Sequence, residues 1–85
     1  TTEVIIDFKQ KQDLQEFANV LETIAQKLKQ EGKFTFMQGT EEVVVEPSSM
    51  LKAEYKYTKK RDKHSFEIEF EWYEGDKGQQ TMQIK

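Results

Sequence analysis

The apolar residues of this chain change their spacing at Gly32. Between residues 11 and 31 they recur at intervals of three and four, which is the period of one face of an α-helix. After Gly32 they alternate with polar residues, which is the period of a β-strand with one buried face. A chain patterned in this way is expected to fold as an α+β domain. The helical stripe consists of Leu14, Phe17, Ala18, Leu21, Ile24, Ala25 and Leu28.

The expected helix covers roughly residues 11–31. Asp13 falls in its first turn, and Lys27 and Lys29 fall in its last turn, where each charge suits the helix dipole. Gly32 occupies the position of a left-handed C-terminal cap. The helix is therefore predicted to end there.

Short alternating segments lie on both sides of this helix. Residues 4–9 carry Val4, Ile6 and Phe8 on one face and predict a first strand. After the helix, Gly39-Thr40 fits a two-residue turn with glycine first, which pairs Phe36 with Val43 and Phe34 with Val45. Pro47 lacks a backbone donor and is predicted to end this ladder.

A second, longer hairpin is predicted from residues 51–58 and 65–73. Both apolar sets share one face only if the numbers of paired residues have an odd sum, and a sum of 123 is the register we predict. A shift by two residues remains the alternative, because the preferred register opposes two glutamates. The preferred register creates the pairs Tyr57 with Phe66, Tyr55 with Ile68, Lys56 with Glu67, and Glu54 with Glu69.

These elements predict a single domain with the order β-α-β-β-β-β, in which one helix packs across one face of an antiparallel-rich sheet. Residues 74–80, with Gly75 and Gly78, are expected to form a turn or loop. Residues 81–85 are expected to form either a short last strand or a frayed tail.

Composition excludes several classes of function. Of the 85 residues 34% are charged, and no apolar run reaches the length of a membrane span, so we expect no contact with a membrane. There is no cysteine and only one histidine, which leaves no thiolate chemistry and no multi-histidine metal site. We expect no cofactor. No signal peptide is recognisable, which predicts a cytoplasmic location. The net charge of −3 argues against nucleic acid as the main partner.

The order of a strand, an amphipathic helix, the segment EGKFTF, Pro47 and the segment SFEIEFEWYEG resembles the amphi-Trp domain family. The most specific part is Phe66 to Trp72, with glutamates between the apolar residues. The resemblance covers about Glu3 to Gly75 and leaves out Gln79 to Lys85. It supports the predicted fold and implies neither an established activity nor catalytic residues.

The glutamates of this strand, Glu67, Glu69 and Glu71, lie about 7 Å apart along one face, a spacing that two catalytic carboxylates or a hard cation could use. We expect instead a solvated face whose acids meet Lys52 and Lys56 across the ladder. No predicted pocket or neighbouring histidine supports acid–base chemistry. The sequence therefore predicts a protein that is not an enzyme.

A basic tip lies between the two long strands, with Tyr55 and Tyr57 behind it. Cations beside aromatic rings can hold single-stranded nucleic acid, so weak nucleic-acid binding is the alternative function. The acidic chain favours an ordinary solvated loop, with His64 at its end in no special role. The basic residues of the tip are Lys59, Lys60, Arg61 and Lys63.

The preferred function follows from the expected widths of the sheet and the helix. Five strands would span about 19 Å, whereas one helix covers a strip of about 10–12 Å. Part of the aromatic face would then stay exposed unless the sheet twists around the helix, and a contiguous apolar patch is typical of a contact surface. We expect a non-enzymatic interaction module whose partner is another protein, a second copy forming a homodimer, or an apolar ligand. Its predicted contact residues are Tyr55, Tyr57, Phe70 and Trp72.

Overall fold

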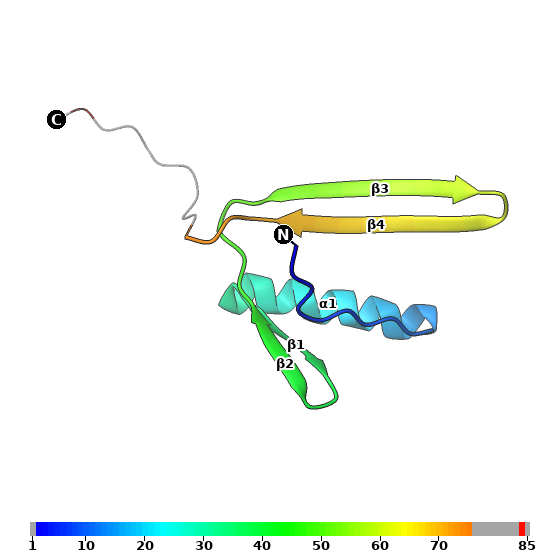
Figure 1. Cartoon of the computed structure of the whole chain (residues 1–85), viewed down its shortest axis with the longest axis horizontal. Coiled ribbons are helices and arrows are strands. Elements are labelled where there is room, and N and C mark those ends of the chain that lie inside the picture. The colour runs from blue at the N-terminus through cyan, green and yellow to red at the C-terminus, as the bar shows by residue number, and fades with distance from the viewer. Residues whose placement is uncertain (1, 76–83, 85) are drawn as a thin grey trace. The chain divides into compact units, whose positions relative to one another are not determined.

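The computed structural model describes residues 2–75 and 84, and it consists of one helix followed by four strands (Figure 1). The predicted α+β class is confirmed. The structure divides the chain into two units, residues 1–46 and residues 47–85, and each is described by itself below. The single-domain assignment stays a prediction.

Helix α1 spans Leu14–Glu31 in the first unit. Asp13 was expected in the first turn of this helix, but it is the N-cap. The Asp13 carboxylate accepts a hydrogen bond from the Glu16 backbone N–H at 2.7 Å. This bond satisfies a donor that the helix cannot pair itself. Gly32 is the predicted left-handed cap, with φ +70°, and its N–H reaches the carbonyl oxygens of Lys27 and Leu28, each at 3.1 Å.

Strands β1 (Phe34–Gln38) and β2 (Glu41–Val45) form the predicted short hairpin. The register is the expected one, with Phe34 opposite Val45 and Phe36 opposite Val43. Gly39 has φ +60°, as the first position of the predicted turn requires. The face shared by these four residues is half-buried, and α1 contacts β1. The apolar interior of this unit lies between the helix and that face, although none of the residues 2–75 and 84 is fully buried.

Strands β3 (Lys52–Lys60) and β4 (Lys63–Glu71) form the long hairpin of the second unit. The predicted register is confirmed in all four of its named pairs. Both strands extend two residues further toward the tip than expected, so the turn is only Arg61-Asp62, and Leu51, Trp72 and Tyr73 lie beyond the other end of the ladder. The lysines that suggested a loop are themselves strand residues, because Lys59 pairs with His64 and Lys60 pairs with Lys63.

Two expectations about the sheet are wrong. Residues 4–9 form no strand, and the strands of the described residues make two two-stranded sheets in place of one wide sheet. Alternation shows that a segment suits a pleated surface, but a strand exists only where another backbone pairs with it, and the sequence does not name that partner. The expected width mismatch between helix and sheet therefore does not arise in that form. The possible strand at 81–85 lies outside the described residues, apart from Ile84, which is in no strand.

Candidate interaction surface on the long hairpin

The register of β3 and β4 separates their side chains into two faces, because opposed residues of an antiparallel pair point to the same side. One face, called here the aromatic face, is almost wholly apolar between its ends. The other, called the charged face, carries every glutamate of the two strands. The aromatic face consists of Ala53, Tyr55, Tyr57, Phe66, Ile68 and Phe70, with Lys59 and His64 at its tip end. The charged face consists of Lys52, Glu54, Lys56, Thr58, Lys60, Lys63, Ser65, Glu67, Glu69 and Glu71.

The aromatic face brings the four predicted contact residues into one row. Tyr55 and Tyr57 are 69% and 61% exposed, and they lie on β3 toward the tip. Phe70 is half-buried near the end of β4. Trp72 follows just beyond the ladder, and its ring stacks on that of Phe70 with a centroid separation of 6.0 Å.

Phe66 and Ile68 complete this row, and they were missing from the predicted contact residues. They lie opposite the two tyrosines and are 63% and 52% exposed. The Tyr57 and Phe66 rings are 6.5 Å apart between centroids. The predicted register already contained these pairs, so sequence reasoning could have found both residues. An apolar row therefore runs along the aromatic face from Tyr57 and continues to Trp72 just beyond the ladder.

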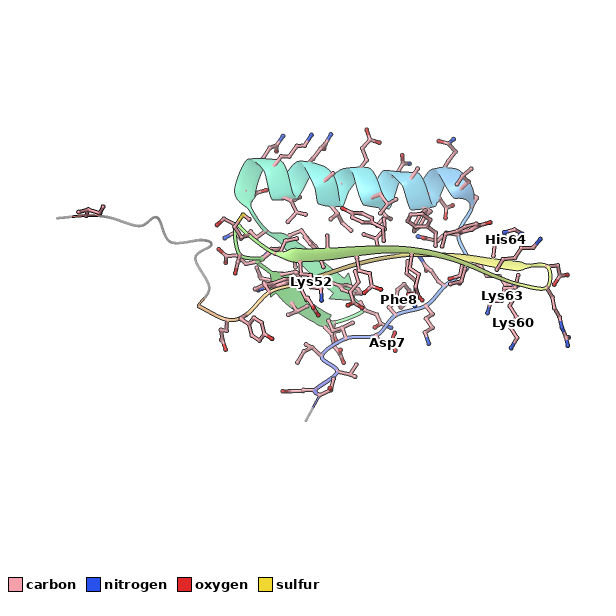
Figure 2. All side chains as sticks on the ribbon, turned by 90° about the horizontal axis from the view of Figure 1, so that it is seen from above. Asp7, Phe8, Lys52, Lys60, Lys63 and His64 are labelled. Atoms are coloured by element: carbon pink, nitrogen blue, oxygen red, sulfur yellow. The ribbon has the colours of Figure 1, made fainter. Side chains whose placement is uncertain are left out.

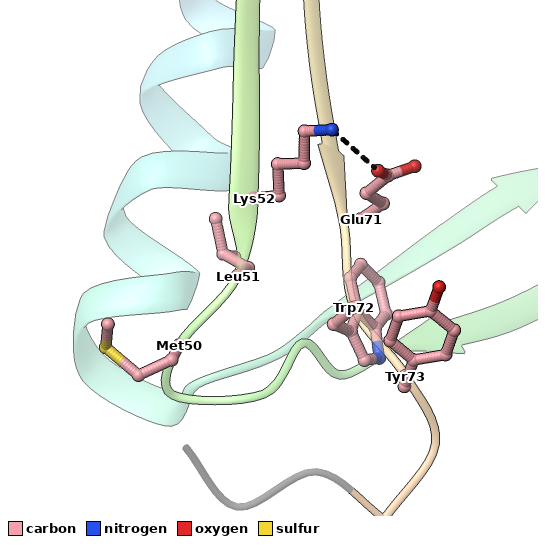
Figure 3. Close-up of a pocket in the computed structure, with 6 residues that line it drawn as sticks. All are labelled: Met50, Leu51, Lys52, Glu71, Trp72 and Tyr73. Carbon is pink, nitrogen blue, oxygen red and sulfur yellow. Dashed lines mark ion pairs between the residues drawn. The ribbon is translucent and has the colours of Figure 1, made fainter. Parts of the chain in front are cut away.

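A hollow of about 540 Å³ lies at the base of the hairpin, where the chain enters β3 and leaves β4 (Figure 3). Lys52 and Glu71 form the last pair of the ladder, with 3.9 Å between Lys52 Nζ and Glu71 Oε1. The apolar walls of the hollow suit an apolar side chain, and the ion pair suits the polar backbone groups next to such a side chain. The hollow is lined by Met50, Leu51, Lys52, Glu71, Trp72 and Tyr73.

The charged face has both paired and opposed like charges. Besides the ion pair at the base, Lys56 Nζ lies 3.7 Å from Glu67 Oε2. The predicted meeting with Lys52 and Lys56 is confirmed for Glu71 and Glu67, whereas Glu69 has no ion pair with either lysine. Among residues 2–75 and 84, no group of three carboxylates or histidines has the spacing of a metal site.

Two pairs on this face oppose charges of the same sign. Glu54 lies opposite Glu69, and Lys60 lies opposite Lys63. Such pairs destabilise a ladder.

The basic tip is a tight turn and not a broad loop, and Figure 2 shows Lys60, Lys63 and His64 near it. Arg61 has φ +57°, in the left-handed region that non-glycine residues seldom adopt. His64 has contacts that the sequence reasoning did not anticipate. Its Nδ1 is hydrogen-bonded to Tyr57 Oη, and the two rings stack with centroids 5.8 Å apart. Diagonal neighbours across an antiparallel ladder lie within reach of aromatic side chains, and the register contains that signal.

No helix in the described part of the chain is both long and apolar enough to cross a membrane. Comparison with curated proteins and with solved structures gives no match. The Amphi-Trp domain family matches residues 1–85, which includes the C-terminal segment that the sequence resemblance had left out. The match spans the whole chain, and the alternating strand that ends before Trp72 has the confirmed register described above. The chain belongs to the Amphi-Trp domain family.

Proposed function

We propose that this protein is a non-enzymatic interaction module that binds another protein through the aromatic face of the long hairpin. The observation that carries the proposal is the row from Tyr57 to Trp72, which is exposed as far as Ile68, half-buried at Phe70 and Trp72, and ends at the hollow. Large apolar patches on soluble proteins are typical of contact surfaces. Tyrosine and tryptophan suit such surfaces because each combines a large apolar body with one polar group.

The chemistry of the surface selects the kind of partner. Its rings favour a protein segment that presents aliphatic or aromatic side chains, one of which would enter the hollow beside Trp72. The Lys52 ammonium and the Glu71 carboxylate lie at this hollow and can bind a backbone carbonyl and a backbone N–H. Catalysis is not part of the proposal, because two of the glutamates that could serve it, Glu67 and Glu71, are paired with lysines within the charged face.

Binding of single-stranded nucleic acid at the basic tip is the competing function. The positions of Lys59 and His64 on the same face as Tyr57 support nucleic-acid binding. The four glutamates of the charged face argue against it, because they repel phosphate. The protein partner therefore remains the better-supported proposal.

A face-specific cross-linking experiment tests the proposal. The photoreactive residue benzoylphenylalanine replaces Tyr55 in the full chain, and Lys56→benzoylphenylalanine is the matched control, one residue along the same strand on the opposite face. We expect cross-links to protein from position 55 and few from position 56. Trp72→Ala should reduce the yield from position 55 several-fold, whereas Lys60→Ala should leave it unchanged.

The same samples distinguish the competing function. Apolar contacts survive added salt, whereas phosphate contacts weaken steeply with salt concentration. Cross-links to nucleic acid that disappear as salt rises would favour the basic tip. Equal protein cross-linking from positions 55 and 56 would refute the aromatic face as the binding surface.

A further inference from the structure

Strand β4 is the less protected of the two long edges of the hairpin. Within the described residues each sheet has two strands, so β4 is hydrogen-bonded to β3 along one edge only. An open strand edge is a template for another strand, and lysines are a common protection against such pairing. Strand β3 carries four lysines among its nine residues, whereas β4 carries only Lys63. The β4 edge also bears the exposed apolar side chains of Phe66 and Ile68.

The two like-charge pairs of the charged face are placed symmetrically along the hairpin. The lysine pair (Lys60 and Lys63) lies next to the turn, and the glutamate pair (Glu54 and Glu69) lies six residues further along each strand. Phe66 is midway between Lys63 and Glu69 on β4. No ion pair within residues 2–75 and 84 neutralises any of these four side chains. Each pair repels within its own chain and is complementary to the other pair.

We propose that two copies of this chain associate by antiparallel pairing of their β4 strands, with the two-fold axis at Phe66. This register sets Lys63 of each copy opposite Glu69 of the partner subunit, and Ser65 opposite Glu67 of the partner subunit. Across the resulting four-stranded sheet, the lysine pair of one copy adjoins the glutamate pair of the other. Opposite charges placed in this way attract and set the register.

Charge also disfavours the neighbouring register that has its axis at Glu67. Moving the axis by one residue to Glu67 sets that glutamate against its own copy and directs Lys63 to Glu71, which is already paired with Lys52. With the axis at Phe66, the two phenylalanines meet each other and Ile68 meets His64 of the partner subunit. The two-fold axis runs normal to the sheet, so both aromatic faces lie on the same side. The contact is self-complementary and closes as a dimer.

This inference goes beyond the proposed function and does not depend on it, because it uses the edge of β4 and the charged face. Variants of the aromatic face that lie away from the axis, such as Trp72→Ala, are therefore expected to leave the dimer unchanged. A dimer without face-specific cross-links would refute only the proposed function. Face-specific cross-links from a strict monomer would refute only the pairing.

Charge reversal on β4 tests the pairing in the full chain. Lys63→Glu and Glu69→Lys each create two like-charge contacts in a homodimer, so each variant alone should dissociate at least about tenfold more readily than the wild type. A mixture of the two variants should restore the dimer, since both contacts of the mixed pair then join opposite charges. Sedimentation equilibrium measures the mass over a range of concentrations.

Two features of these variants keep the result interpretable. Within one hairpin each reversal removes a like-charge pair, so the melting temperature should stay equal or rise while the dimer weakens. A dimer lost through misfolding would instead show a lower melting temperature, and in that case Lys63→Gln and Glu69→Gln give the same test through the salt dependence of dimerisation.

The matched control reverses the equivalent residues of β3, Lys60→Glu and Glu54→Lys, which are one strand away from the proposed contact. We expect the dissociation constants of both β3 variants to stay closer to the wild-type value than those of the β4 variants do. The pairing is overturned if the wild type keeps a mass of 10.1 kDa up to about 1 mM. It is overturned equally if the mixture of β4 variants stays monomeric, or if only the mixture of β3 variants recovers a dimer.

Discussion

Gly32 offers a test of how much helix α1 depends on its C-terminal cap. Its backbone has φ +70° and ψ +13°, and its N–H is bonded to two carbonyl oxygens of the last helical turn. A Cβ atom built on Gly32 meets no heavy atom within 4 Å. Replacement by alanine therefore introduces no clash, and its effect is confined to the backbone conformation.

The magnitude follows from two opposing terms. An L-residue in the left-handed region costs about 1–2 kcal/mol. Replacing glycine also restricts the unfolded chain, which returns about 0.4–1 kcal/mol. Gly32→Ala should therefore lower the free energy of unfolding by about 1 kcal/mol.

The mirror-image residue supplies the control. D-Alanine adds the same atoms but prefers the left-handed region, so Gly32→D-Ala should raise the free energy of unfolding by about 0.4–1 kcal/mol. Urea unfolding followed by far-UV circular dichroism measures both chemically synthesised variants. Equal free energies of unfolding for the L- and D-alanine variants would refute the argument, because chirality is the only difference between them.

Two further predictions concern the turn of the long hairpin and the end of α1. Arg61→Gly should raise the free energy of unfolding by about 0.5–1 kcal/mol, because glycine adopts φ +57° without strain; a loss of stability in urea unfolding would contradict this. A hydrogen bond from Lys27 at 2.9 Å, together with its charge, lowers the pKa of Glu31. A lowered carboxyl pKa means that the pair stabilises the helix at neutral pH and that this contribution is lost as the pH falls through the lowered pKa. An NMR titration should show the pKa of Glu31 rising toward its ordinary value in Lys27→Gln, and an unchanged pKa would show that Lys27 is not the cause.

Much of the candidate surface could be predicted from local patterns. The parity of apolar positions placed Tyr57 opposite Phe66, and the structure confirms that register together with its like-charge pair of Glu54 and Glu69. The residues of the aromatic face follow from that register alone. The contact between Tyr57 and His64 is also a consequence of it, as a diagonal across the ladder.

Other features could not be predicted because local patterns do not contain them. The ladder of the long hairpin continues to Lys60 and resumes at Lys63, although both residues suggested a loop. Their pairing depends on the turn at Arg61, whose left-handed backbone is unusual for arginine. Residues 4–9 alternate as a strand should, yet they pair with no described strand.

By itself, the sequence determined the helix, the register of the short hairpin and the family, and it favoured the register of the long hairpin that the structure confirms, because helical period, strand alternation and capping are properties of neighbouring residues. Only the tertiary structure decided which backbones pair into sheets, where the long ladder stops, and that Trp72 stacks on Phe70 beside a hollow. The physical reason is that strand pairing joins separate segments of the chain and a ring contact depends on side-chain geometry, whereas the hydrophobic effect that drives both is non-directional. The alternation of apolar and polar residues indicates which face of a strand is apolar, but it does not indicate what that face will contact.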